Sequence, residues 1–156
     1  MIAVKIRKIV KKKLKESMSV YDVIGATPQN NFLIKAGAYS IVSHNCSPND
    51  VIGLDILCLT GDTKIWHEDG TWKTLESLEN KKLQLYNYND KEKYIALSDT
   101  CEVKKTKETQ DLIEIVTADG SSIKCTPEHR FLLKTGQYKL ARDLTVEDEL
   151  EDGEDI

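Results

Sequence analysis

The sequence predicts a compact all-β fold with short hairpins and little helix. Short apolar segments rich in β-branched residues recur about every 8–12 residues with turn residues between them, a pattern of antiparallel β proteins rather than of βαβ units. Two Asp-Gly pairs, at 69–70 and 119–120, each separate two such segments and predict tight hairpins. No internal repeat is visible in the sequence.

The first 44 residues supply four expected strands. Each is a short apolar or β-branched segment, and a Gly-Ala-Thr-Pro-Gln-Asn turn at 25–30 and Gly37 separate the last three from one another. The expected strands are Ile2–Ile6, Val20–Ile24, Phe32–Ile34 and Tyr39–Val42.

The later part of the chain continues the pattern, with one helical turn expected at Leu140–Leu144 and an acidic, frayed end from Glu147 to Asp155. The expected strands here are Thr63–Trp66 with Thr71–Trp72, Leu83–Tyr88 before a turn at 89–90, and Leu112–Val116 with Ser122–Cys125.

Composition favours a soluble, cytoplasmic, single-domain protein. The 156 residues are 40% hydrophobic and 31% charged. No apolar run approaches the roughly 18 residues that span a bilayer, and no apolar signal core follows the basic N-terminus, so we expect no membrane partner. The four cysteines show neither CxxC nor zinc-site spacing, which favours free thiols and no metal or cofactor. A secreted domain with two disulfides is the alternative.

Charge is segregated along the chain. Residues 1–45 carry eight Lys or Arg against two acidic residues, a balance of +6, whereas residues 58–156 carry 14 basic against 22 acidic residues, a balance of −8. A lysine cluster is often a solvated face or a nucleic-acid patch. Because the acidic residues 58–156 belong to the same chain as the basic residues 1–45, we expect no nucleic-acid partner. We expect instead that these two segments attract each other, as if they were once separate molecules.

One tripeptide, His44-Asn45-Cys46, has the groups needed to cut its own backbone, and Cys58 follows twelve residues later. The Asn side chain attacks its own carbonyl, the His donates a proton, and a thiol carries an acyl group. An exposed loop with two unrelated thiols is the alternative for the tripeptide alone. Further on, Pro127 keeps Thr126 out of helical geometry, with His129 three residues after that Thr.

These motifs together resemble the intein family. The shared features are a leading Cys followed by Gly-Asp-Thr, an Asp-Gly hairpin running into Thr-x-x-His, a Tyr-Asp strand, an Asn-Phe strand, and His-Asn before a Cys. In this chain they are Cys58 with 61–63, 119–125 with Thr126 and His129, Tyr21-Asp22, Asn31-Phe32, and His44-Asn45 before Cys46.

The resemblance implies the horseshoe-like Hint fold that inteins share with hedgehog autoprocessing domains. It also implies that the order is permuted. Residues 1–45 match the C-terminal intein part, 58–156 match the N-terminal part, and 46–57 form an extein-like connector. The two parts, basic and acidic like those of naturally split inteins, would form one monomeric domain without an endonuclease insert. One departure is Asn30, where the family often has His.

The resemblance also implies a role for each site residue. Cys58 attacks the carbonyl of Leu57, while Thr126 and His129 assist at that bond. Cys46 then takes over the acyl group. The remaining roles are that Asp22 controls the Cys46 thiol, His44 assists the cyclisation of Asn45, and Asp62 supports the Cys58 junction; simple turn or strand-end roles are the alternatives for Asp22 and Asp62.

Because the order is permuted, the reaction would release residues 46–57 as a cyclic peptide, unless the chain stalls as a precursor or the connector is only a tether. This order is the one used for engineered cyclisation, which indicates a designed fusion that acts as a single-turnover autocatalyst rather than a turnover enzyme. The alternatives are a hedgehog-like domain, a non-catalytic complementation module, and a metal site formed by His44, Cys46, Cys58 and His129.

Overall fold

A computed structural model of the chain describes residues 3–44 and 58–153, and Asn45, Cys46 and the remainder of the connector lie outside the described residues. The prediction of an all-β fold is confirmed, and the only helical elements in the described ranges are two 3-10 turns. In chain order, the elements are β1 (Ala3–Ile24), β2 (Asn31–Ala36), β3 (Tyr39–His44), β4 (Leu59–Thr60), β5 (Lys64–Trp66), β6 (Trp72–Thr74), η2 (Glu76–Leu78), β7 (Lys82–Leu83), β8 (Tyr86–Asn89), β9 (Tyr94–Leu97), β10 (Cys101–Thr117), β11 (Ser122–Cys125), β12 (Arg130–Leu132), β13 (Tyr138–Leu140), η3 (Ala141–Asp143) and β14 (Glu149–Glu151).

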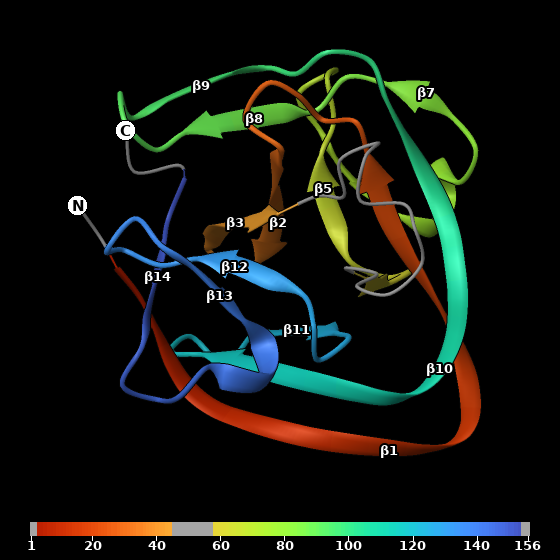
Figure 1. Cartoon of the computed structure of the whole chain (residues 1–156), viewed down its shortest axis with the longest axis vertical. Helices are drawn as coiled ribbons and strands as arrows, with labels where there is room; N and C mark the ends of the chain where they lie inside the picture. Colours follow the sequence, from red (N-terminus) through yellow and green to blue (C-terminus); the bar gives the residue numbers. More distant parts are fainter. Residues whose placement is uncertain (1–2, 45–57, 154–156) are drawn as a thin grey trace.

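The strands form two six-stranded sheets and one two-stranded sheet. The first sheet has the order β14-β1-β4-β11-β10-β7, with a further pairing of β1 with β10, and the second has the order β13-β12-β3-β2-β5-β6. In Figure 1, β1 and β10 curve together around one side of the molecule and give it a horseshoe outline. Strands from 3–44 lie between strands from 58–153 in both sheets, because β1 separates β14 from β4, and the pair β3-β2 separates β12 from β5.

The first two expected strands are in fact one. The sequence predicts strands at Ile2–Ile6 and Val20–Ile24, but β1 is continuous over 22 residues and includes the lysine run between them. Its partner β10 pairs with it from Ile6 opposite Thr117 to Ile24 opposite Glu102, with three register shifts. The lysine run shows no apolar alternation because that part of the ribbon is largely exposed. Its charges are instead matched across the ribbon, where Lys12 lies 3.1 Å from Glu114 and Lys13 lies 3.1 Å from Asp111.

The C-terminal region is also more ordered than expected, and the prediction of a frayed end is wrong for residues 149–153. Strand β14 pairs with the start of β1, with Leu150 opposite Val4, and both side chains are fully buried. The Asp152 carboxylate accepts a hydrogen bond from the Ser40 amide at 3.2 Å. Pairing at the sheet edge therefore orders a segment whose acidic composition alone suggests a solvated tail.

The short hairpins and the helical turn follow the sequence prediction. Strands β5 and β6 pair across Asp69-Gly70, with Trp66 opposite Trp72. Strands β10 and β11 pair across Asp119-Gly120. Both glycines have positive φ, 84° and 88°, a conformation that residues with a Cβ rarely adopt. The expected helical turn is η3, which lies within the predicted range.

The main hydrophobic core draws on both six-stranded sheets. Its buried side chains include Val23 and Ile115 from the first sheet and Phe32, Ile34 and Phe131 from the second. The core therefore fixes β1, β3 and β12 relative to one another, and these strands carry or adjoin the candidate site. Within the described ranges, no helix is long and apolar enough to cross a membrane.

Candidate active site

Cys58 is the first residue of the second described range and lies immediately before β4. It is fully buried. Strand β4 is held on both sides, because Leu59 is paired with Tyr21 of β1 and with Cys125 of β11. Cys58 is thus buried next to a strand that two neighbouring strands fix. No disulfide joins Cys58 to Cys101 or Cys125, the other described cysteines.

Thr126 is hydrogen-bonded to both backbone polar groups of Cys58, the amide and the carbonyl. The Cys58 amide donates to the Thr126 hydroxyl at 3.2 Å, and the Thr126 amide donates to the Cys58 carbonyl at 2.9 Å. The hydroxyl also lies 3.4 Å from that carbonyl oxygen. The turn that follows β11 therefore places a hydroxyl against the nitrogen of the Leu57–Cys58 peptide bond.

His129 is held in the same turn and is fully buried. Its amide donates to the Thr126 carbonyl at 3.1 Å, and its own carbonyl accepts from Ala141 at 2.7 Å. The imidazole packs 4.8 Å from the ring of Phe131, and its Nε2 is hydrogen-bonded to the hydroxyl of Ser43. Burial, with a smaller contribution from nearby His44, lowers the pKa of His129 to about 3, so the ring is neutral at physiological pH.

The other ring nitrogen of His129 is buried but has no hydrogen-bond partner among the described residues. A buried donor or acceptor without a partner is costly, and in native proteins it often marks a group reserved for chemistry. This Nδ1 is therefore the ring atom of His129 that remains available for a further hydrogen bond.

His44 is the last residue of β3 and lies near His129. The His44 ring packs edge-on against the Tyr138 ring, with 5.0 Å between the ring centroids. The charge of His44 contributes to lowering the pKa of His129. Burial raises the pKa of Tyr138 to about 12, so this neighbour is a neutral phenol. Asn45 and Cys46 follow directly in the sequence and lie outside the described residues.

Asp22 is buried on β1, close to Cys58 in register. Val20 is paired with Thr60 and Tyr21 with Leu59. One residue further along this antiparallel register, Asp22 lies next to Cys58. The Asp22 carboxylate accepts a hydrogen bond from the amide of Val23 at 2.7 Å. A buried carboxylate is thus placed on the strand that pairs with β4, close to Cys58.

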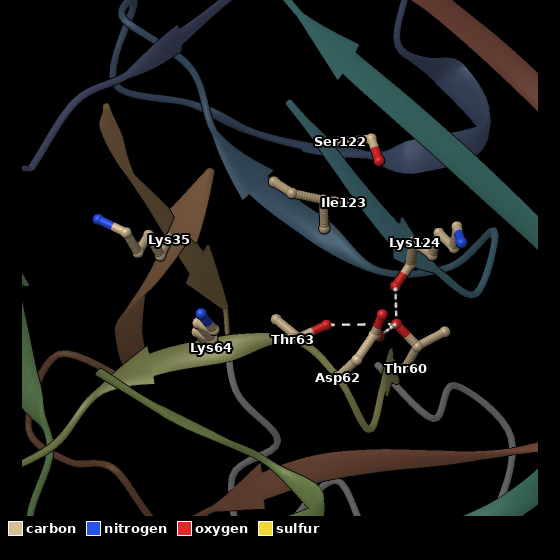
Figure 2. A pocket seen from close by; sticks show the side chains of 8 residues that line it. All are labelled: Lys35, Thr60, Asp62, Thr63, Lys64, Ser122, Ile123 and Lys124. Carbon is tan, nitrogen blue, oxygen red and sulfur yellow. Dashed lines mark hydrogen bonds between the residues drawn. The ribbon is translucent and has the colours of Figure 1, made fainter. Parts of the chain in front are cut away.

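Asp62 differs from these residues because it is exposed. Its carboxylate accepts the Thr60 hydroxyl at 2.6 Å within the turn that follows β4. Figure 2 shows Asp62 at a pocket of about 140 Å³ into which Thr60 and Thr63 also project. Among the described residues its hydrogen-bond partner is Thr60, an arrangement that stabilises the turn.

Two further contacts at the site have no signal in the sequence. The first involves Thr106, which lies in a β-bulge of β10, since Lys107 is opposite Val20 and Lys105 is opposite Tyr21. Its hydroxyl lies 2.7 Å from the Cys58 sulfur and donates to the Val20 carbonyl at 3.3 Å. Bulges commonly re-aim a side chain in this way.

The second contact that sequence reasoning missed is the hydrogen bond between Ser43 and His129. Ser43 occupies an ordinary position in β3, and only the pairing of β3 with β12 brings its hydroxyl to the imidazole. A serine in a strand carries no local signal of such a role.

The remaining described thiols are suited to packing rather than chemistry. Burial raises the pKa of Cys101 to about 11 and also raises the pKa of Cys125 above its ordinary value, so both are protonated at neutral pH. No group of three or more His, Cys, Asp or Glu side chains within 3–44 and 58–153 could hold a metal ion.

The chain is thus an all-β protein in which Thr126 is hydrogen-bonded to the backbone of the buried Cys58, with the buried, neutral His129 in the same turn. No known protein-family profile matches the chain. The chain is 35% identical to the DNA gyrase B protein of Synechocystis sp. over 97 residues, which are 60% of this chain and 9% of that protein. It is 26% identical to the ribonucleoside-diphosphate reductase large subunit of Invertebrate iridescent virus 6 over 100 residues, 64% of this chain and 10% of that protein. The chain thus spans about a tenth of the length of the curated relatives it matches.

Proposed function

We propose that this chain is an intein that carries out autocatalytic protein splicing. The observation that carries the proposal is the contact of the Thr126 hydroxyl with the Cys58 nitrogen, with the buried, neutral His129 in the same turn. These are a nucleophile, a polar group at the bond to be broken and a proton donor, the set that acyl transfer from a peptide bond requires.

In the first step, the sulfur of Cys58 bonds to the carbonyl carbon of Leu57 and the carbon–nitrogen bond between residues 57 and 58 breaks. The thiol loses its proton and the departing amine of Cys58 gains one, so the step is a proton-balanced exchange of an amide for a thioester. His129 donates its Nδ1 proton to the departing amine and its ring regains the proton released by the Cys58 thiol, so the ring begins and ends neutral. Thr126 orients the amide nitrogen.

The next steps transfer the acyl group and release it. The thiol of Cys46 displaces Cys58 from the Leu57 thioester, with Asp22 adjusting the reactivity of that thiol. The side-chain amide nitrogen of Asn45 then attacks the backbone carbonyl carbon of the same residue. The peptide bond to Cys46 breaks while His44 assists proton transfer to the departing amine. The freed Cys46 amine finally takes the acyl group from its own sulfur, which gives an ordinary peptide bond.

In this order of segments, residues 46–57 would leave as a head-to-tail cyclic peptide of twelve residues, the length of that segment. Residues 1–45 and 58–156 act as the two parts of one splicing domain, joined by the connector in a permuted, designed arrangement. Strands of both parts are combined within each large sheet, which supports a single catalytic unit. Holding the two junctions together supplies an effective molarity of about 10⁵ M or more.

The comparisons support an element inserted into unrelated hosts. A gyrase protein and a reductase protein have different names and activities, yet each matches this chain over only about a tenth of its length. A match confined to about a hundred residues in each of two such proteins is the pattern that an inserted splicing domain leaves.

The proposal is tested by following the intact mass of freshly purified protein over time with a thiol reductant. Splicing predicts loss of residues 46–57 as a cyclic peptide and the appearance of fragments 1–45 and 58–156, and Asn45→Ala should abolish that peptide. Cleavage at 57–58 alone would replace the proposal with a hedgehog-like reaction. An unchanged mass would replace it with a non-catalytic complementation module.

A further inference from the structure

Ser43 and His129 form a buried pair that links the two parts of the chain. Ser43 belongs to β3 and lies opposite Phe131 of β12, and both Ser43 and His129 are fully buried. The Ser43 hydroxyl is hydrogen-bonded to Nε2 of His129. No other hydrogen bond of the Ser43 side chain is present among the described residues, so this contact is its one opportunity to donate or accept.

The number of unsatisfied groups differs between the two tautomers of the neutral ring. If Nε2 carries the proton, it donates to Ser43, and the hydroxyl proton of Ser43 and the lone pair of Nδ1 both stay unsatisfied. If Nδ1 carries the proton, the hydroxyl donates to Nε2 and only the Nδ1 proton lacks a partner. Buried polar groups without partners are costly, so the arrangement favours a proton on Nδ1.

We propose that Ser43 is a positioning residue that fixes His129 as the tautomer with its proton on Nδ1. The use of that proton at the Leu57–Cys58 bond rests on the proposed function. Ser43 belongs to β3 and lies two residues before Asn45 in the sequence. The tautomer of His129 therefore depends on the position of β3, the strand that leads to the Asn45–Cys46 bond.

The tautomer can be read without any reaction. Long-range proton–nitrogen NMR spectra of the full chain carrying Cys58→Ala and ¹⁵N-labelled histidine distinguish the two ring nitrogens, and the chain has only three histidines to assign. We expect the proton of His129 on Nδ1 and its redistribution toward Nε2 in Ser43→Ala. Ser43→Thr, which keeps a hydroxyl, should restore the original spectrum.

Ser40→Ala is the matched control, because Ser40 is a fully buried serine on the same strand whose hydroxyl has no hydrogen-bond partner among the described residues. It should leave the His129 spectrum unchanged. A proton on Nε2 in the unsubstituted ring would overturn the proposal, and this result needs no Ser43 variant to fold. The same conclusion follows if a folded Ser43→Ala protein keeps the parental tautomer.

The kinetic consequence is measured in the chain with Cys58 intact. Ser43→Ala should slow thioester formation at Cys58 by about tenfold, the effect of one buried hydrogen bond, and Ser43→Thr should recover most of the rate. A parent chain that forms no thioester would refute the proposed function, whereas the NMR experiment would still decide the tautomer. Equal rates in Ser43→Ala and the parent would remove Ser43 from the mechanism.

Discussion

At the scale of single residues, Thr106 is in contact with the sulfur of Cys58, the nucleophile of the proposed function. The Thr106 hydroxyl lies 2.7 Å from the Cys58 sulfur, where either atom can donate, and 3.3 Å from the Val20 carbonyl. Thr106→Val keeps the side-chain shape and removes the hydrogen bond to the sulfur, so thioester formation should slow by about three- to tenfold. The measurement is the rate at which added thiol cleaves the chain before Cys58.

Thr109→Val provides the control, since Thr109 lies on the same strand and contacts the carbonyl of Asp111 instead. It should react at the parental rate. Indistinguishable rates for the Thr106 and Thr109 variants would contradict a role for Thr106.

His129 makes stability depend on pH in a defined window. The unfolded ring titrates near 6.5, whereas burial lowers the pKa of the folded ring to about 3. Between these values the unfolded chain binds a proton that the folded chain does not, so stability falls as the pH falls below 6.5. The unfolding constant should change by up to about tenfold per pH unit from this one group.

His129→Gln lacks this titration, so urea unfolding between pH 6.5 and pH 4 should show a shallower loss of stability for the variant than for the parent. The difference between the two curves removes the contribution of the carboxylates that both proteins share. Parallel curves would mean that the folded ring titrates normally and is not buried as described.

Single residues also show which parts of the site could be predicted from the sequence. The sequence predicts Cys58, Thr126 and His129 as site residues because together they form motifs that resemble those of inteins, and the structure brings the Thr126 hydroxyl to the Cys58 nitrogen. Ser43 and Thr106 could not be predicted, because their roles depend on strand pairing and on a bulge that local sequence does not encode. A serine or threonine in a strand is otherwise an ordinary residue.

At the scale of elements, β14 shows that the acidic end contributes to the fold. Leu150 is fully buried opposite Val4, so Leu150→Ala should lower the free energy of unfolding by about 2–5 kcal/mol. Val146→Ala is the control at a 56% exposed side chain, where a change within about 0.5 kcal/mol is expected. Urea midpoints measure both, and a frayed end would make them equal.

The hairpins were predictable and the long ribbon was not, for one physical reason. A hairpin across Asp119-Gly120 is specified by residues next to one another in sequence. In β1 and β10, Ile6 pairs with Thr117 and Ile24 pairs with Glu102, so the pairing connects distant parts of the chain. Its exposed lysines lack the alternation that marks a half-buried strand, and only the partner reveals why they are extended.

At the scale of the whole molecule, the opposite charges of the two parts should govern how fast separate fragments meet. Fragments 1–45 and 58–156 carry charges of +6 and −8, and ion pairs such as Lys12 with Glu114 join them across the ribbon. Raising the salt concentration from low to high should slow association by about tenfold or more, with a smaller change in dissociation.

Stopped-flow fluorescence of the mixed fragments measures both rates, with Trp66 and Trp72 as internal probes on one fragment. A fragment 1–45 in which Lys11, Lys12 and Lys13 are replaced by Gln provides the control, because it should associate more slowly and respond less to salt. An association rate that does not depend on salt would mean that apolar contacts alone bring the parts together.

The first step of the proposed mechanism is the conversion, by Cys58, of its own preceding peptide bond into a thioester. To detect this thioester, the Asn45→Ala chain is treated with hydroxylamine and its intact mass is followed, with Cys58→Ala as the reference. We predict cleavage between Leu57 and Cys58, a hydroxamate on the fragment that ends at Leu57, and none of this product from the Cys58→Ala chain. Equal, negligible cleavage of both chains would mean that no thioester forms at Cys58.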